Sequence, residues 1–307
     1  MEKEILIFGH RSPDTDSITS SIVMANLEAK LGNNAIACRL GDINKETEYV
    51  LNYLGIDAPK LLENVPDGAE VILVDHANVK ESISNLDNVI IKKIIDHHQV
   101  LLNTSYPLYY RAEPLGSTST ILYKLYKENN IEIDKVIATL MLSAIISDTL
   151  LFKSPTCTDE DVKTAKELKN IAGVDIEKYG LEMLKAGTDL SSFTTEQILS
   201  LDAKAIDLKS TKAIIAQINT ASIPNVMERK LYLEPAMNKI INEKGLDLYM
   251  LLITDIVNSN SQVIALGKGA HIVEKAYGVT LENNTALLKG VVSRKKQVVP
   301  IMTENAD

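Results

Sequence analysis

Three short apolar segments in the first hundred residues lead into Asp and His side chains. They are EILIF before His10, EVILV before Asp75 and His76, and VIIKKII before Asp96, His97 and His98. Short apolar segments that alternate with helix-like ones are typical of buried strands in a parallel sheet wrapped in helices. Open α/β sheets bind ligands at the carboxyl ends of their strands. The sequence therefore predicts an α/β fold with a site built from these Asp and His residues.

The rest of the first half continues this alternation. Strands are predicted at 4–8, 34–40, 70–75 and 89–96, and helices at 17–31, 46–54, 116–130, 134–148, 159–171 and 176–185. A polar stretch rich in Ser and Thr follows at 186–195 and is typical of a linker between domains. We therefore expect an N-terminal domain at 1–187, a hinge at 188–194 and a C-terminal domain at 195–307.

The C-terminal domain is expected to be a smaller, mixed α/β domain. Strands are predicted at 211–219, 246–256, 262–267, 286–290 and 291–301, with a helix at about 226–244.

Composition narrows the class of protein. The 307 residues carry a net charge of −9, which disfavours sequence-independent nucleic-acid binding because such binding rests on a basic surface. A small anionic substrate stays open, since a local basic pocket can outweigh the global charge. No stretch approaches 18 consecutive apolar residues, and the two cysteines lie far apart. We expect a cytoplasmic protein with reduced thiols, without nucleic-acid or membrane partners.

The Asp and His residues suggest a site for hard divalent metal ions. Carboxylate oxygens and imidazole nitrogens suit Mn, Co, Fe or Mg, and the lack of paired cysteines argues against a thiolate site. Asp14 and Asp16 are two residues apart and can reach different metals, although either can instead cap the helix that begins near Ser17. Asp75 is the candidate to bridge two metals. His76 is more readily interpreted as an orienting histidine.

Two further segments carry candidate ligands. Adjacent residues on a strand point opposite ways, so His97 and His98 are expected to divide between a metal and the substrate. Asp96 is a candidate to hydrogen-bond one of their rings. Asp148 ends an apolar helix, where an acidic side chain opposes the helix dipole and hints at a nearby cation.

Basic residues in the second half are candidates to bind an anion. Arg294, Lys295 and Lys296 are consecutive and flanked by valines, which indicates either an oxyanion site or a charge-protected edge strand. On a regular strand Arg294 and Lys295 point to opposite faces, so a shared role requires the strand to end, bulge or twist there. Lys204 alone reads as a solvated lysine. The GSTST run at 116–120 is compatible with an anion at a helix start or with a plain N-cap.

Four motifs together resemble a known group. GHxxPDxDS, VDH, DHH and SDT occur in the order found in the DHH phosphoesterase superfamily. The segments SDTLLFKSPTCTD at 147–159 and SRKKQVVP at 293–300 are similar to the family II inorganic pyrophosphatases, which depend on manganese or cobalt. That family often has Asn where this chain has Ser12, so no role is carried over to that position.

The resemblance implies roles for individual residues. One metal would be held by His10, Asp14 and Asp75, and the other by Asp16, Asp75, His97 and Asp148. Contacts to substrate phosphates would come from His98, Lys204, Arg294 and Lys295. It also implies two α/β domains with the active site in the cleft between them, and a homodimer joined through the N-terminal domain.

The expected reaction is hydrolysis of inorganic diphosphate to two orthophosphates. Two divalent ions, preferably Mn²⁺ or Co²⁺ with additional Mg²⁺ brought by the substrate, would be bridged by Asp75 and would share a hydroxide nucleophile, with His98 assisting the leaving oxygen. The alternative is a DHH phosphodiesterase or exopolyphosphatase acting on short oligonucleotides, cyclic dinucleotides or polyphosphate. A metal or phosphate sensor would require lost ligands, and each expected ligand is present.

Overall fold

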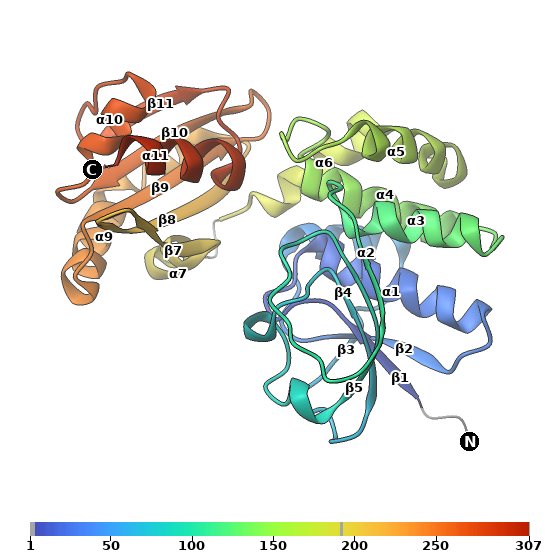
Figure 1. The fold of residues 1–307 in the computed structure, drawn as a ribbon. Helices are drawn as coiled ribbons and strands as arrows, with labels where there is room; N and C mark the ends of the chain where they lie inside the picture. Colours follow the sequence, from blue (N-terminus) through green and yellow to red (C-terminus); the bar gives the residue numbers. More distant parts are fainter. Residues whose placement is uncertain (1–3, 191–192, 307) are drawn as a thin grey trace. The chain divides into compact units, whose positions relative to one another are not determined.

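The computed structural model describes residues 4–190 and 193–306 of the chain. The chain divides into two compact units, residues 1–186 and 187–307 (Figure 1). The predicted hinge at 188–194 includes Ser191 and Ser192, which lie outside the described residues.

The N-terminal unit is built on a six-stranded sheet in which every paired strand is parallel. The order is β3-β2-β1-β4-β5-β6, with bounds β1 Ile5–Phe8, β2 Ala35–Arg39, β3 Lys60–Leu61, β4 Glu70–Val74, β5 Ile90–Asp96 and β6 Tyr109–Ala112. The four predicted strands are confirmed. Two strands were not predicted: β3, which has two residues, and β6, whose side chains are mostly exposed and show no apolar run.

Six helices accompany this sheet, in agreement with the prediction. They are α1 Thr15–Lys30, α2 Lys45–Leu54, α3 Thr118–Glu128, α4 Lys135–Thr149, α5 Asp159–Ala172 and α6 Ile176–Gly187. Helix α1 packs against β1, β2 and β4 on one side and against α3 and α4 on the other. Helix α4 packs against α1, α3 and α5 and is buried nearly all round, which explains its uniformly apolar sequence.

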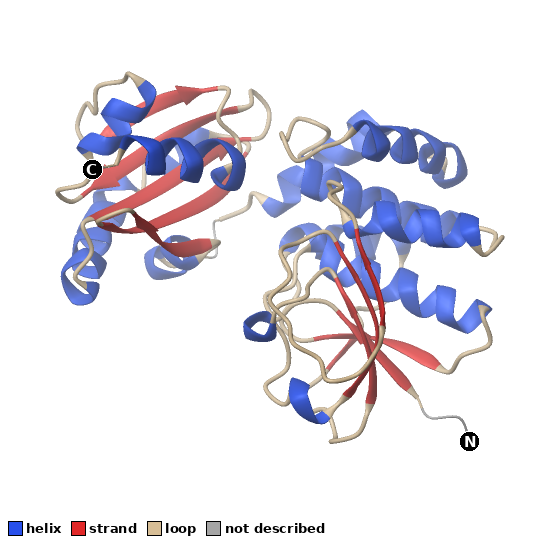
Figure 2. Cartoon of the chain, in the orientation of Figure 1, coloured by secondary structure: helices blue, strands red, loops and turns tan. Residues whose placement is uncertain are grey.

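The other face of the sheet is covered without long helices (Figure 2). Side chains such as Phe8, Leu73 and Ile94 form a core there with apolar residues from 62–108, a region that contains two short 3₁₀ turns, Val79–Glu81 and Leu86–Asn88. Both faces of the sheet are thus filled, and the carboxyl ends of its strands carry the polar residues.

The C-terminal unit contains a mixed sheet, as predicted, and four of its five strands were predicted; β7 was not. Its order is β11-β10-β9-β8-β7; only β8 and β9 pair in parallel. The strands are β7 Ala203–Leu208, β8 Thr211–Thr220, β9 Leu248–Asp255, β10 Asn260–Leu266 and β11 Thr285–Lys289. One face packs on α7 Thr195–Ser200, α8 Ile223–Met227 and α9 Lys230–Lys244, and the other on α10 His271–Tyr277 and α11 Val299–Asn305. The single helix predicted at 226–244 is two helices.

The strand predicted at 291–301 is wrong. Arg294–Val298 form a π-helical turn that leads into α11. The Gln297 side chain accepts hydrogen bonds from the backbone of Val292 and Ser293 (2.9 and 3.1 Å), and the Ser293 hydroxyl caps the turn. Val298 and Met302, four residues apart, bury one helical face. The apolar residues flanking the cations therefore follow a helical and not a strand period.

Within the described residues, no helix is both long and apolar enough to cross a bilayer.

Candidate metal centre

Asp75 follows β4 and lies at the centre of the site. Its backbone is left-handed (φ +60°), a conformation that costs energy for a residue other than glycine, and its side chain is almost fully buried. The Oδ1 atom accepts a hydrogen bond from the Thr118 hydroxyl (3.1 Å), whereas Oδ2 is buried without any hydrogen-bond donor among the described residues. A buried acceptor left unsatisfied is costly. Strain and an orphaned oxygen together indicate a functional carboxylate.

One group of possible ligands surrounds the Oδ2 side of Asp75. His10 Nε2 lies 3.5 Å from Asp75 Oδ2 and 3.5 Å from Asp14 Oδ2. The other oxygen of Asp14 accepts a hydrogen bond from the Ser17 backbone (2.9 Å) at the start of α1. Asp14 thus caps the helix with one oxygen while its other oxygen faces His10, so capping the helix leaves this second oxygen available to a metal ion.

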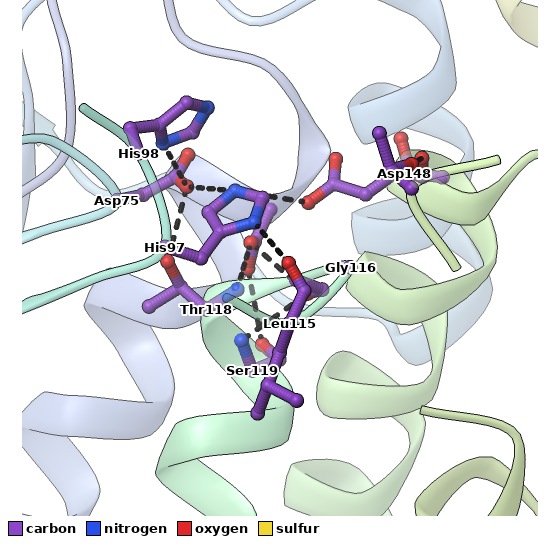
Figure 3. A network of polar contacts seen from close by, with 12 residues as sticks. Asp75, His97, His98, Leu115, Gly116, Thr118, Ser119 and Asp148 are labelled. Atoms are coloured by element: carbon purple, nitrogen blue, oxygen red, sulfur yellow. Dashed lines mark hydrogen bonds and ion pairs between the residues drawn. The ribbon is translucent and has the colours of Figure 1, made fainter. Parts of the chain in front are cut away.

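A second group lies on the Oδ1 side of Asp75. It brings together one ligand atom each from Asp16, Asp75, His97 and Asp148, all within 4.8 Å of one another. His97 Nε2 lies 3.4 Å from Asp75 Oδ1 and 3.8 Å from Asp148 Oδ2 (Figure 3). Asp148 sits in the last turn of α4, and its Oδ2 is another buried oxygen without a donor in the described chain.

The GSTST run has a function that the sequence left open. Asp16 Oδ2 accepts hydrogen bonds from the Thr118 backbone (2.7 Å) and the Ser117 hydroxyl (3.0 Å), and Oδ1 accepts from the hydroxyls of Ser20 (2.6 Å) and Ser119 (3.2 Å). The anion at the start of α3 is therefore the carboxylate of Asp16. The small polar run was the only signal, and it could not name a partner a hundred residues away.

The two adjacent histidines are fixed by different partners. His97 Nδ1 bonds to the Leu115 carbonyl (2.9 Å) and His98 Nδ1 to Asp96 Oδ1 (3.0 Å), which confirms Asp96 as a partner of one ring. Such partners orient the ring and set its tautomer. Because β5 ends at Asp96, the alternation of strand faces does not apply, and the rings lie 4.0 Å apart. Both therefore turn towards Asp75.

His76 does not join this cluster. Its Nδ1 bonds to the Val74 carbonyl (2.9 Å) and its Nε2 to the Ser82 hydroxyl (3.1 Å). Burial lowers the pKa of His76 to about 4. The ring is a neutral part of the core.

The cluster has an excess of negative charge. Burial, followed by the charges of Asp16 and Asp14, raises the pKa of Asp75 and of Asp148 well above the usual range of a carboxyl. Burial alone would lower the pKa of His10, but Asp14 and Asp75 outweigh it and raise that pKa to about 9. Divalent cations would relieve this repulsion, and an all-oxygen and imidazole donor set fits manganese.

Of the predicted substrate contacts, His98 lies in the N-terminal unit, and the three cations lie in the C-terminal unit. Lys204 is on β7, while Arg294 and Lys295 begin the π-helical turn. The Arg294 guanidinium donates to the Asp202 carbonyl and, at 2.7 Å, to Asp202 Oδ1. Arg294 is thereby tethered to Asp202, which directly precedes β7 and lies two residues before Lys204 in the sequence. The helical turn removes the strand alternation that set Arg294 and Lys295 on opposite faces.

Comparisons with known proteins agree with this architecture. Residues 4–145 match the DHH family, N-terminal domain, and residues 181–305 match the DHHA2 domain. The manganese-dependent inorganic pyrophosphatase of Bacillus subtilis (strain 168) is 58% identical over 306 residues, covering 99% of both chains. A solved structure from Methanococcus jannaschii, assigned to the family II inorganic pyrophosphatases, superposes with a TM-score of 0.80 at 40% identity and covers 98% of this chain and 99% of its own.

A more distant structure, an exopolyphosphatase-related protein from Bacteroides fragilis, shares only the fold, with 15% identity and a TM-score of 0.51 over 99% of this chain and 91% of its own. Full-length identity of this order to the B. subtilis protein, together with both domain matches, is decisive. The chain belongs to the family II, manganese-dependent inorganic pyrophosphatases of the DHH superfamily.

Proposed function

We propose that this protein hydrolyses inorganic diphosphate to two orthophosphates with two divalent ions, Mn²⁺ or Co²⁺ being preferred and Mg²⁺ arriving with the substrate. The observation that carries the proposal is the position of Asp75. Its Oδ2 lies 3.5 Å from His10 Nε2 and its Oδ1 lies 3.4 Å from His97 Nε2, so one carboxylate serves both groups of ligands. Relatives with 58% identity over the full chain carry the corresponding name.

Each metal has its own set of candidate ligands. One is assigned to His10, Asp14 and Asp75, and the other to Asp16, Asp75, His97 and Asp148. When bound, two such ions would lower the pKa of a shared water enough to supply hydroxide for attack on phosphorus near neutral pH. Asp16 is held by four hydrogen bonds, so its carboxylate is oriented before any ion arrives.

His98 is assigned to the substrate. The His98 Nδ1 atom bonds to Asp96 Oδ1 (3.0 Å), which orients the ring and leaves Nε2 for the bridging or leaving oxygen. The side chain is 40% exposed, in contrast to 12% for His97, so His98 is the ring that a substrate can reach.

Lys204, Arg294 and Lys295 are assigned to the phosphate oxygens. The guanidinium fork suits two oxygens at once, and Asp202 holds it in place. The proposed metal ligands belong to the N-terminal unit and these cations to the C-terminal unit. A hinge at 188–194, between domains at 1–187 and 195–307, would permit closure that excludes water.

The proposal is tested by phosphate release from chelator-stripped protein with and without added Mn²⁺ or Co²⁺. Diphosphate, polyphosphate, a short oligonucleotide and a cyclic dinucleotide are compared. We expect rapid metal-dependent turnover of diphosphate alone. Turnover confined to the longer substrates would transfer the function to the DHH phosphodiesterases or exopolyphosphatases.

We also propose a cytoplasmic homodimer joined through the N-terminal unit. Both cysteines are free thiols, which suits a reducing compartment. Strand β6 forms one edge of the sheet and exposes Tyr109 and Tyr110, and an edge strand of this kind can pair with another chain.

Tyr109→Lys is expected to weaken this dimer, since a charge on an edge strand opposes pairing. Light scattering coupled to gel filtration should give twice the mass of one chain for the unmodified protein and a concentration-dependent fall towards one chain for the variant. Tyr53→Lys on α2 is the matched control, because Tyr53 is 52% exposed and Tyr109 is 44% exposed. Equal dimer stability in both variants would place the interface elsewhere.

A further inference from the structure

Asp161 is a buried carboxylate with more hydrogen bonds than its helix requires. It lies in the first turn of α5 and is fully buried. Its Oδ2 accepts from the Thr158 backbone (2.8 Å), which completes the capping box of α5, and from the Thr158 hydroxyl (2.6 Å). It also accepts from the Gly116 backbone (2.8 Å), and Oδ1 accepts from the Thr120 hydroxyl (2.6 Å). The last two bonds cross more than forty residues and have no part in capping.

The segment that Asp161 holds is the one that contacts the metal ligands (Figure 3). Between Gly116 and Thr120 lies Thr118, whose backbone donates to Asp16 (2.7 Å) and whose hydroxyl donates to Asp75 (3.1 Å). The Leu115 carbonyl, next to Gly116, bonds to His97 Nδ1 (2.9 Å). Asp161 therefore fixes both ends of a segment that orients three candidate ligands.

The segment that begins at Gly116 lies very close to Asp161 and to the end of α4. A Cβ atom added to Gly116 would lie 2.7 Å from Asp161 Oδ2 and 2.8 Å from Thr149 Cγ2, so only glycine fits there. Thr149 directly follows Asp148. The same contact thus joins the 116–120 segment to the end of α4 that carries the fourth ligand of the second group.

We infer that Asp161 is a positioning residue that sets the manganese affinity of the site. It acts through Gly116 and Thr120 on the orientation of Thr118 and Leu115, and does not touch a metal itself. Among the described residues that contact its carboxylate none is a cation, so the hydrogen bonds alone hold it. This inference rests on the proposed function, because it takes Asp16, Asp75 and His97 as manganese ligands.

The experiment measures dissociation constants for Mn²⁺ alone, by titration of folded, chelator-stripped proteins. Asp161→Ala is expected to weaken Mn²⁺ binding about ten-fold, the lower end of what loss of a partner of a metal ligand causes. Asp161→Asn should restore most of the affinity, because the amide oxygen can accept from Gly116 and the amide nitrogen can donate to Thr120.

Thr158→Ala is the matched control. It removes the hydroxyl that caps α5 but leaves the bonds from Asp161 to Gly116 and Thr120. We expect a lower melting temperature and unchanged Mn²⁺ affinity. If Asp161→Ala fails to fold, Thr120→Val removes one of the two long-range bonds, and the expected loss is a few-fold.

Two results would overturn the inference while leaving the proposed function intact. One is unchanged affinity in Asp161→Ala or, where that variant does not fold, in Thr120→Val. The other is an equal loss in Thr158→Ala, which would reduce Asp161 to a helix cap. Failure of the unmodified protein to bind Mn²⁺ would instead overturn the proposed function and the inference with it.

Discussion

Asp75→Asn is expected to lower diphosphate turnover about a thousand-fold, because charge stabilisation by metals is worth several kcal/mol and each 1.4 kcal/mol changes a rate about ten-fold. The amide keeps the shape of the side chain but removes the charge that faces both ligand groups. Mn²⁺ affinity should fall in parallel. Asp87→Asn, on an exposed residue of the second 3₁₀ turn, is the control and should behave like the unmodified protein.

Although Asp75→Asn should lower turnover, we expect it to stabilise the chelator-stripped protein against unfolding. The pKa of Asp75 is raised in the folded state, by burial first and by Asp16 and Asp14 next. Folding therefore favours the protonated form, and this contribution to stability is lost as pH rises from the ordinary carboxyl pKa towards the raised one. Asp75→Asn removes the free-energy cost of keeping this buried carboxylate charged at neutral pH.

Thermal melts at neutral pH check this reversal. Without metal, Asp75→Asn should melt above the unmodified protein. With saturating Mn²⁺ the unmodified protein should melt higher, because an ion that binds only the folded state stabilises it. Turnover and Mn²⁺ affinity near those of the unmodified protein would show that Asp75 does not bridge two ions.

His98→Gln is expected to lower kcat about 100- to 1,000-fold, within the range for loss of a general acid. Because His98 is assigned to the substrate and not to a metal, the Mn²⁺ affinity of the His98→Gln variant should stay close to that of the unmodified protein. His97→Gln should instead lose Mn²⁺ affinity. The comparison is needed because His98 Nδ1 also lies 3.6 Å from Asp75 Oδ1.

Steady-state kinetics and Mn²⁺ titration of both variants separate the two roles. His271→Gln, on an exposed histidine of α10, controls for the substitution itself. If His98→Gln lost as much Mn²⁺ affinity as His97→Gln, both rings would be ligands and the assignment of His98 to the substrate would fail.

Four strands of the N-terminal sheet, and the gathering of Asp and His residues at their carboxyl ends, could be predicted from the sequence for one physical reason. Parallel strands end at the same edge of a sheet, so Asp75 after β4 and His97 after β5 had to lie close together. Asp148 indicated a metal site less strongly, because an acidic side chain at the C-terminal end of a helix is only weakly unfavourable. The structure places its carboxylate oxygen 3.8 Å from His97.

Other features depend on contacts that no local pattern reveals. The valines around Arg294 fit a strand as well as a helix. The turn forms because the Gln297 side chain accepts the hydrogen bonds of the Val292 and Ser293 backbone that a neighbouring strand would otherwise accept. The hydrogen bond from Gly116 to Asp161 spans 45 residues. Hydrophobic periodicity indicates which residues are buried and not which residues they contact, so it cannot predict such tertiary hydrogen bonds.

We propose that Asp75 is shared by two metal ions in one centre. The most direct test is the stoichiometry of Mn²⁺ bound by the chelator-stripped protein, measured by equilibrium titration alongside Asp75→Asn. We expect two ions per chain, with both sites weakened in the variant because Asp75 faces both groups. A single ion per chain in the folded protein, or a variant that loses only one of two ions, would contradict it.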